Sequence, residues 1–340
     1  MRHWLVRKFA DRREEGTALL TAILMTAFMA VIAVSLIDQT RFALFRTANM
    51  DRRDQAYWYA MGARDFSESI LLRSGPADRL VMRPQEPWLT GPRQFAIEGG
   101  QLRGHVRDGN NCLNVNALAG NAGAAPEAPG RGLDMRSTQL MFSALLDRLG
   151  VAPDRIEPLK AQIVDWIDAN TFQEAGGAED QTYLGFEPPL RAANQPMVEL
   201  EELRVLPVVT PALYARISPY LCVRDERTQP PLNVNTLQPD QAVLLSALFG
   251  GRLSVGDAEA VLLQRPPTGY EAAAELFDHP LIAALEPDLA LRDAVTVRTQ
   301  WFDIEVEVEL GETAFSLSER VELTQDGRLR RHAQRFGAVQ

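Results

Sequence analysis

Oxygen-bearing side chains are concentrated in the segment 165–180, which is the strongest candidate for chemistry in this chain. They are Asp165, Asp168, Asn170, Glu174, Glu179 and Asp180. A hard cation such as Ca²⁺ takes six to eight oxygen ligands, which carboxylates and carbonyls on flexible loops supply. Clustered carboxylates repel each other unless a cation compensates their charge. The segment therefore predicts either a calcium site or a solvated acidic loop.

The spacing of these side chains does not decide between the two interpretations. Phe172 stands where an EF-hand loop would need a ligand, so the segment is not an EF-hand. Apolar residues within 163–167 predict one buried face of a helix. The glycine pair at 176–177 predicts an irregular loop after that helix. The acidic side chains would then lie in and around this loop.

Patterns for other chemistries are missing from the sequence. The four histidines are scattered singly, and the two cysteines lack the spacing of zinc ligands. The sequence contains no G-x-S-x-G nucleophile motif and no glycine loop for phosphates. We therefore expect that the chain is not an enzyme.

The overall charge argues against nucleic acid as a partner. The chain has 340 residues and a formal net charge of -10. An acidic surface repels a phosphate backbone. The length leaves room for two domains beyond a membrane helix.

The N-terminus predicts a membrane helix behind a short basic leader. No charged side chain lies between Glu15 and Asp38, and a helix over this run would be about 33 Å long, enough to cross a bilayer core. A secretory signal has its small-residue cleavage site after the apolar run. Here the small residue, Gly16, comes before it, so that cleavage would make Thr17 the new N-terminus. This arrangement resembles the type IV prepilin class.

Two cysteines lie far apart in the sequence. They are Cys112 and Cys222. The basic leader should stay in the cytoplasm, which places the rest of the chain across the membrane. In an oxidising periplasm the two cysteines could form one disulfide, although two buried free thiols fit the sequence equally well.

The order of the elements predicts an α+β, pilin-like fold with a long N-terminal helix on an antiparallel sheet. The segment 17–74 has no proline, so it predicts one helix of about 85 Å. Two short strands are predicted within 95–107. The segment 301–310 alternates apolar and acidic residues, as in a half-buried strand. Further strands are predicted over 314–324 and 328–336, around an Asp-Gly turn.

Between the two strand regions lies a long, mostly helical stretch, which we interpret as an inserted α-helical domain. The predicted organisation is a prepilin leader (1–16), a transmembrane part (17–37), the rest of the pilin helix with the first strands (38–112), the inserted domain (113–292) and the C-terminal strands (293–340).

An internal repeat marks the inserted domain. Leu-Asn-Val-Asn at 113–116 recurs at 232–235, and a predicted helix of similar sequence follows each copy. Asparagine suits a helix entry because its side chain can accept a hydrogen bond from an open backbone N–H. The second copy also resembles a helix-hairpin-helix DNA module. The acids Asp257 and Glu259 near its glycine hairpin favour a shared fold without DNA binding.

Several segments, taken together, match a known family. In chain order they are the leader that ends at Gly16, then 113–116, 165–168, 177–180 with Tyr183, 198–203, Pro219-Tyr220 and 232–235. Over nearly its whole length the chain resembles the general secretion pathway protein K family, the large minor pseudopilin of type II secretion systems. The resemblance implies a bacterial inner-membrane protein, single-pass, with its C-terminal domains in the periplasm.

One departure from ordinary pilins agrees with this resemblance. Most pilin-like subunits carry Glu at the fifth position after the cleavage point, where it pairs with a neighbour's N-terminal amine. Here that position is Thr21, which cannot form the ion pair. The protein K family also lacks this Glu and is placed at the pseudopilus tip. The resemblance thus implies a cap formed with the minor pseudopilins I and J on a base of the major pseudopilin G.

The resemblance also implies processing and a metal. A prepilin peptidase would cleave between Gly16 and Thr17, and Thr17 would become N-methylated. The family resemblance includes structural Ca²⁺ in the acidic segment, and there we favour as ligands Asp168, Asn170, Glu174, Glu179 and Asp180.

Further partners would be the outer-membrane secretin or the secreted substrates. Two alternatives are a minor pilin of a type IV pilus and a membrane-anchored DNA-uptake module. The large insert and the missing Glu weigh against the first, and the negative charge weighs against the second.

Overall fold

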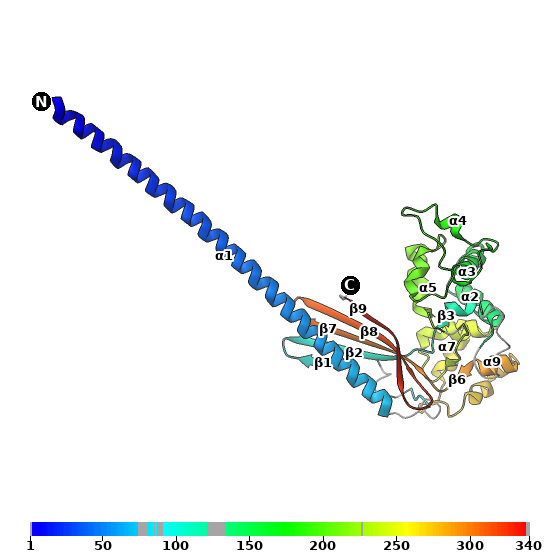
Figure 1. The fold of residues 1–340 in the computed structure, drawn as a ribbon. Coiled ribbons are helices and arrows are strands. Elements are labelled where there is room, and N and C mark those ends of the chain that lie inside the picture. Colours follow the sequence, from blue (N-terminus) through cyan, green and yellow to red (C-terminus); the bar gives the residue numbers. More distant parts are fainter. Residues whose placement is uncertain are drawn as a thin grey trace.

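The structure is a computed structural model, and it describes residues 2–73, 81–84, 86, 91–120, 133–225 and 227–337. Within the N-terminal helix, side chains are described from Thr17 onward. The chain forms a long helix, an antiparallel sheet and a separate group of short helices (Figure 1). These elements confirm the predicted α+β, pilin-like fold.

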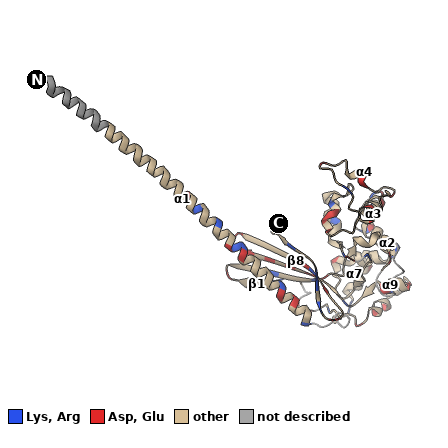
Figure 2. Ribbon diagram, viewed as in Figure 1, with Lys and Arg blue, Asp and Glu red and all other residues tan. Residues whose placement is uncertain are grey.

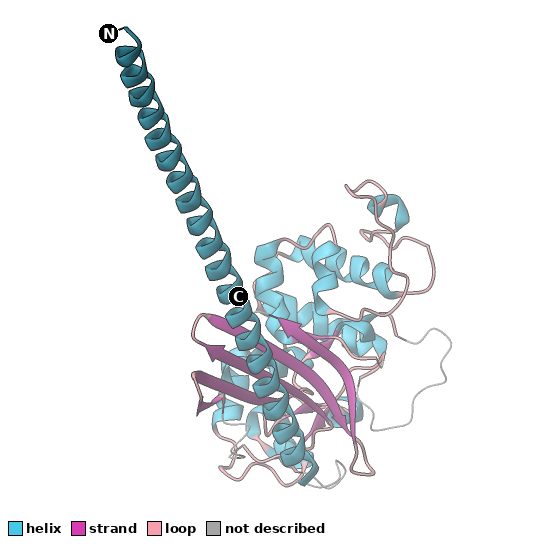
Figure 3. Ribbon diagram, turned by 60° about the vertical axis from the view of Figure 1, so that its left-hand side comes forward, coloured by secondary structure: helices cyan, strands magenta, loops and turns pink. Residues whose placement is uncertain are grey.

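The long helix is α1 (Arg2–Arg73), and its end lies one residue before the predicted end at position 74. Its N-terminal half extends away from all other elements, and its C-terminal half lies across the sheet (Figures 1 and 3). From Thr17 it has the length and composition to cross a membrane, and its apolar stretch is not buried in the protein. Figure 2 shows this stretch free of charged residues. An exposed apolar helix of this kind needs lipid or partner helices around it.

The five-stranded sheet has the order β1-β2-β7-β8-β9 with every neighbour antiparallel. Its strands are β1 (Arg93–Ile97), β2 (Gly100–Asp108), β7 (Trp301–Leu310), β8 (Thr313–Leu323) and β9 (Leu329–Gly337). They match the strands predicted from the alternation of apolar and polar residues. The helical domain leaves the sheet after β2 and returns to it before β7, which confirms an insertion.

Small residues let α1 approach the sheet closely. Ala56 and Ala60 are fully buried against strand residues such as Ile304, Val306 and Val308. The intervening acidic residues of β7 point to the opposite face, as the period of two requires. The sheet therefore has one face covered by α1 and one charged face.

The inserted domain contains most of the remaining elements. Its helices are α2 (Met135–Arg148), α3 (Pro153–Ile167), α4 (Asp180–Tyr183), α5 (Pro211–Ile217), α6 (Ala242–Leu248), α7 (Val255–Leu263), α8 (Pro280–Ala283) and α9 (Leu289–Asp293). Its 3-10 helices are η1 (Val115–Leu118), η2 (Leu200–Val205), η3 (Ser218–Tyr220), η4 (Pro239–Gln241) and η5 (Ala273–Asp278). Its core extends from Leu113 to Val297, so the domain continues past the predicted end at 292.

The repeated Asn motif marks two equivalent corners. The strand β3 (Leu113–Asn114) pairs in parallel with β4 (Leu221–Cys222), and β5 (Leu232–Asn233) pairs in parallel with β6 (Val295–Thr296). In each corner the first Asn accepts a hydrogen bond from the backbone N–H of the second. The domain therefore consists of two units of similar design, each running from an Asn motif to a closing strand.

The second Asn of each corner holds a later loop. Asn116 accepts from the N–H of Met197 and donates to its carbonyl, at 2.9 Å each. Asn235 does the same with Tyr270, at 2.8 Å each. Each loop then enters a 3-10 helix, and a glutamate in its first turn accepts from the backbone three residues earlier. The asparagines thus act as structural corners.

Candidate functional site

The acidic segment begins where α3 ends. The N–H of Asp168 donates to the carbonyl of Val164 and closes the last turn. Asp168 Oδ1 then accepts from the N–H of Asn170 at 3.1 Å, and Asn170 Oδ1 accepts from the N–H of Phe172 at 2.7 Å. This chain of side-chain-to-backbone bonds turns the segment away from the helix axis. The predicted irregular loop is present.

A carboxylate on the buried face of α3 organises the loop. Asp165 is fully buried and accepts from the N–H of Glu174 at 3.1 Å. Gly177 passes so close that a Cβ at this position would lie 2.0 Å from Asp165 Oδ2. Burial raises the pKa of Asp165, and the charges of Asp168 and Glu174 add to this. The glycine is therefore required for the backbone to reach the carboxylate.

Glu179 is the most unusual acid of the segment. Only 5% of the residue is exposed, and both carboxylate oxygens are buried without a hydrogen-bond partner. Burial raises its pKa, and Asp165 and Asp168 raise it further by repulsion. The buried Tyr183 hydroxyl also lacks a hydrogen-bond partner, and burial together with Asp165 and Glu179 raises its pKa. A buried carboxylate without a donor is costly unless a positive charge compensates it.

The other predicted ligands have different surroundings. Asp180 pairs with Arg191 Nη1 at 3.0 Å and accepts from the N–H of Ala192, so both of its oxygens are engaged. Asn170 is exposed and uses its oxygen on Phe172. Among the described residues, no three Asp, Glu, His or Cys side chains form a group that could hold a metal ion. The segment thus has buried, repelling carboxylates but not a complete ligand shell.

Asp165 was not among the predicted ligands, although the charges of Asp168 and Glu174 act on its pKa and its own charge acts on that of Glu179. The sequence could have indicated its burial, because Asp165 lies between Ile163 and Trp166 on the apolar face of a helix. Trp166 on the same face donates a hydrogen bond from Nε1 to Glu202 at 3.0 Å.

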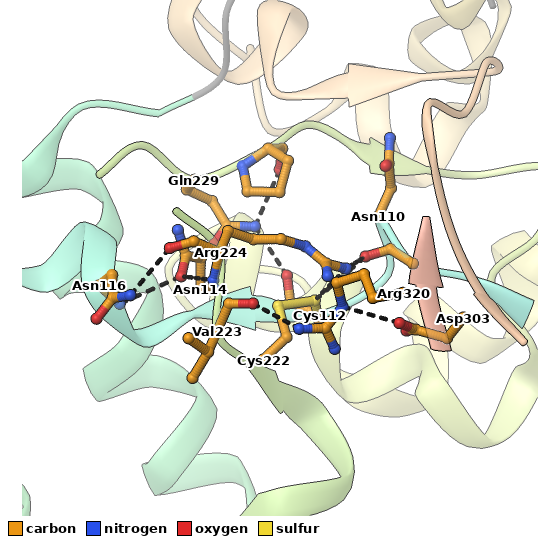
Figure 4. The surroundings of a disulfide bond; sticks show 12 residues. Asn110, Cys112, Asn114, Asn116, Cys222, Val223, Arg224, Gln229, Asp303 and Arg320 are labelled. Carbon is orange, nitrogen blue, oxygen red and sulfur yellow. Dashed lines mark hydrogen bonds and ion pairs between the residues drawn. A yellow bond between two sulfur atoms is a disulfide. The ribbon is translucent and has the colours of Figure 1, made fainter. Parts of the chain in front are cut away.

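The cysteines lie where the helical domain joins the sheet (Figure 4). Cys112 and Cys222 form a disulfide with a Cα–Cα distance of 5.7 Å. Beside it, Arg320 of β8 donates to the carbonyl of Val223 at 2.7 Å and to Asp303 at 2.8 Å. Although burial opposes it, the charge of Arg320 holds the pKa of Asp303 below its usual value. The disulfide therefore closes the first unit next to its attachment to the sheet.

A cleft of 570 Å³ lies between the sheet and the helical domain, and a second group of ion pairs connects its two sides. Arg335 of β9 lies between Glu199 and Glu201 and contacts Glu201 at 2.7 Å. These contacts join the last strand to the entry of η2 and brace the cleft.

A partly buried charge cluster between α1 and the sheet was not predicted from the sequence. Arg331 binds both oxygens of Glu68 at 2.8 Å and lies 3.4 Å from Glu319. Arg64 lies 3.9 Å from Glu319, whose side chain is fully buried. Burial and the nearby Glu68 raise the pKa of Glu319 to about 7, although both arginines oppose this. The cluster fixes the rotation of α1 on the sheet.

The predicted processing and assembly residues lie in the exposed half of α1. Gly16 and Thr17 are within the helix, and the side chains before Thr17 are outside the described part. The hydroxyl of Thr21 donates to the carbonyl of Ala18 at 3.0 Å within the same helix. Position 21 therefore presents no charge to a neighbour.

Comparisons with known proteins agree with this architecture. Two family models, both described as type II secretion system protein K, match residues 111–226 and 232–298. They divide the helical domain between the two units seen in the structure. Type II secretion system protein K of Pectobacterium carotovorum is 33% identical over 310 residues, which cover 89% of this chain and 90% of that protein. The Klebsiella pneumoniae protein is 30% identical and covers 97% of this chain and 96% of its own length.

A solved structure has the same fold. It comes from the GspK-GspI-GspJ complex of the enterotoxigenic Escherichia coli type 2 secretion system. The TM-score is 0.73 at 29% identity, with 86% of this chain and all of that chain covered. The pilin-like domain and the inserted helical domain therefore occur together in a known protein of this kind.

Proposed function

The chain belongs to the type II secretion system protein K family, a minor pseudopilin of that system, and we propose that it caps the pseudopilus. In this role it assembles with the minor pseudopilins I and J, as the GspK of the solved complex does with GspI and GspJ. The cap stands on the major pseudopilin G and supports protein export. Its role is to bind and position other proteins rather than to catalyse a reaction.

The observation that carries this proposal is the combination of Thr21 with the place of the helical domain. Because position 21 is uncharged, the subunit has no need of a neighbour above it in the filament. The helical domain lies at the end of α1 that is far from the exposed apolar half (Figure 1). A bulky domain at that end leaves little space for a further subunit beyond it. Both features suit the last subunit of a filament.

We also propose a maturation route. Prepilin peptidase cleaves between Gly16 and Thr17, and Thr17 becomes N-methylated. The apolar half of α1 first lies in the inner membrane, with the other domains in the periplasm, and then packs among the helices of the filament. The cap would meet the outer-membrane secretin or secreted substrates.

Mass spectrometry of the protein from native membranes tests this route. A chain that starts at a methylated Thr17 is the expected result. A chain that still starts at Met1, in cells with active prepilin peptidase, would overturn the pseudopilin assembly route.

A variant of position 21 tests the cap. Thr21→Glu restores the charge of an ordinary pilin, and quantitative mass spectrometry of sheared pseudopili then measures its copies per filament. We expect no increase, because the helical domain still leaves little space for a subunit above it. A clear rise in copies along the shaft for Thr21→Glu alone would contradict the proposal.

We further propose that the acidic segment binds Ca²⁺, which would compensate its buried carboxylates. No three of the described carboxylates form a metal-binding group as they stand, so binding would draw Asp165, Asp168, Glu174 and Glu179 together around the ion. Asn170 is bonded to the N–H of Phe172, and Asp180 is paired with Arg191. The support is the unpartnered, buried carboxylate of Glu179 and the glycine that reaches Asp165. Bound calcium would supply positive charge and join the loop to α3.

Thermal melting with calcium and with a chelator tests this site in the full chain. Calcium should raise the Tm of the wild type, and Asp168→Ala with Glu179→Ala should remove that rise. Asp240→Ala, an acid outside the segment, is the matched control and should keep it. An unchanged calcium dependence in the double variant would refute the site.

A further inference from the structure

The first unit of the helical domain contains an arm that the second unit lacks. In the first unit, residues 168–196 connect the end of α3 to Met197, which Asn116 holds. In the second unit, residues 264–269 connect the end of α7 to Tyr270, which Asn235 holds. The short connection shows that a unit can close without an arm of this length, although Ala178 and Tyr183 of the arm are buried in the core. Its extra length calls for another purpose.

Large apolar side chains are exposed on this arm. The exposed fractions are 82% for Phe172, 50% for Leu184 and 39% for Leu190. Val198, two residues past the arm, is 72% exposed. Single exposed apolar residues are ordinary, but several on one projecting segment indicate a contact surface. Phe172 is also held in place, since Asn170 caps its N–H.

The position of the arm indicates which partner it meets. Figures 1 and 3 both place α4 on the side of the helical domain toward which the N-terminal half of α1 extends. In a filament, the subunits nearer the membrane pack around that half of α1. They therefore lie on the same side as the arm.

The charge of the arm indicates the chemistry of the partner surface. The arm has one basic residue, Arg191, which is paired with Asp180, and its acidic residues are Asp168, Glu174, Glu179, Asp180 and Glu187. Five acids and one Arg give a formal charge of -4, and a Ca²⁺ ion bound in the acidic segment would leave a charge of -2. A complementary surface has an apolar pocket for an aromatic ring with basic side chains at its rim. Aromatic anchors in such pockets commonly dominate binding.

We propose that residues 168–196 form a docking arm for a neighbouring minor pseudopilin, with Phe172 as its anchor. The inference rests on the proposed cap function, and the contact lies outside the packed N-terminal helices of the filament. Through Asp168 and Glu174, which flank Phe172, calcium in the acidic segment would also fix the anchor.

Binding of the full, processed chain to the minor pseudopilins I and J in detergent tests the arm. Phe172→Asp should weaken binding by about tenfold or more, with an unchanged Tm because the ring is exposed. The matched control is Leu289→Asp on α9, where the side chain is 79% exposed, and it should bind like the wild type. Equal binding of Phe172→Asp and wild type would overturn the docking arm alone. A wild type that does not bind I and J at all would instead contradict the cap proposal.

A photocrosslinking amino acid at position 172 gives an independent result in cells. Crosslinks to the minor pseudopilins I or J are expected, and the same probe at position 289 should give none. Crosslinks from position 172 only to the secretin or to secreted proteins would overturn the assignment of the partner.

Discussion

The two units of the helical domain share their corners but differ in what they add. Each has an Asn motif, a parallel strand pair and an asparagine that holds a later loop. The first unit adds a disulfide and the acidic arm, and the second adds neither among its described residues. The asparagines of the shared corners are buried and hydrogen-bonded, whereas the arm carries the unpartnered carboxylate of Glu179 and exposed apolar side chains. The difference separates the parts that make the fold from those available for binding.

Removing the disulfide should have the largest effect on stability. It joins residues 110 positions apart, and crosslinks over such loops are worth about 3–5 kcal/mol. Chemical denaturation of the full chain in detergent should show a loss of this size for Cys112→Ala with Cys222→Ala. A reducing agent should destabilise the wild type and leave the double variant unchanged. A loss below about 1 kcal/mol would mean that the first unit does not depend on its crosslink.

Substitution of the corner asparagines should cause the next largest loss of stability, and the two positions should differ in the size of this loss. Asn116 bonds to two backbone groups of Met197 and also donates to the carbonyl of Arg224 at 2.9 Å. Among the described residues, the side chain of Asn235 bonds to the two groups of Tyr270. Each buried group left unpaired costs about 1 kcal/mol or more. Denaturation should therefore show a loss of about 3 kcal/mol for Asn116→Ala and about 2 kcal/mol for Asn235→Ala; the reverse order would break the comparison.

The buried glutamates Glu319, between α1 and the sheet, and Glu179, in the arm, have different charged neighbours. Glu319 lies between two arginines, whereas the charged groups that act on the pKa of Glu179 are the acids Asp165, Asp168 and Asp180. Because folding raises the pKa of Glu319 from 4.5 to about 7, its stabilising contribution is complete below pH 4.5 and is lost as the pH rises through 7. Glu319→Gln should therefore gain about 1–3 kcal/mol over the wild type between pH 4.5 and 8. Stability curves of the two proteins that stay parallel over this range would contradict this.

The smallest effect is expected for Glu179→Gln. The raised pKa of Glu179 means that its ionised form is unfavourable in the folded protein, so the neutral amide should stabilise the chain slightly in the presence of a chelator. The same variant should lose the gain from calcium. Asp180→Asn, at an acid paired with Arg191, is the control and should keep the calcium response.

Local signals in the sequence predicted a large part of the fold. The alternation in 301–310 indicated a strand with those same bounds, and the lack of proline indicated one continuous helix. The repeated Asn motif predicted two similar corners, because an asparagine bonds to the nearby backbone. These predictions needed no knowledge of distant contacts.

The missed features depend on residues that only the fold brings together. Arg331 and Glu68 are 263 positions apart, and nothing in the alternation of β9 indicates that pairing. Arg191, which engages Asp180, lies across an irregular loop with no periodic pattern. The sequence also did not decide whether the two cysteines form a disulfide, because a buried cysteine can be a free thiol or part of a bridge.

The place of this chain in an intact pseudopilus is the most direct test of the cap. Electron cryomicroscopy of native-length filaments, with an antibody fragment bound to the helical domain, would locate it. We predict label at one end of each filament, together with the minor pseudopilins I and J. Label repeated along the shaft would contradict the cap and, with it, the proposed role of Thr21 and of the helical domain.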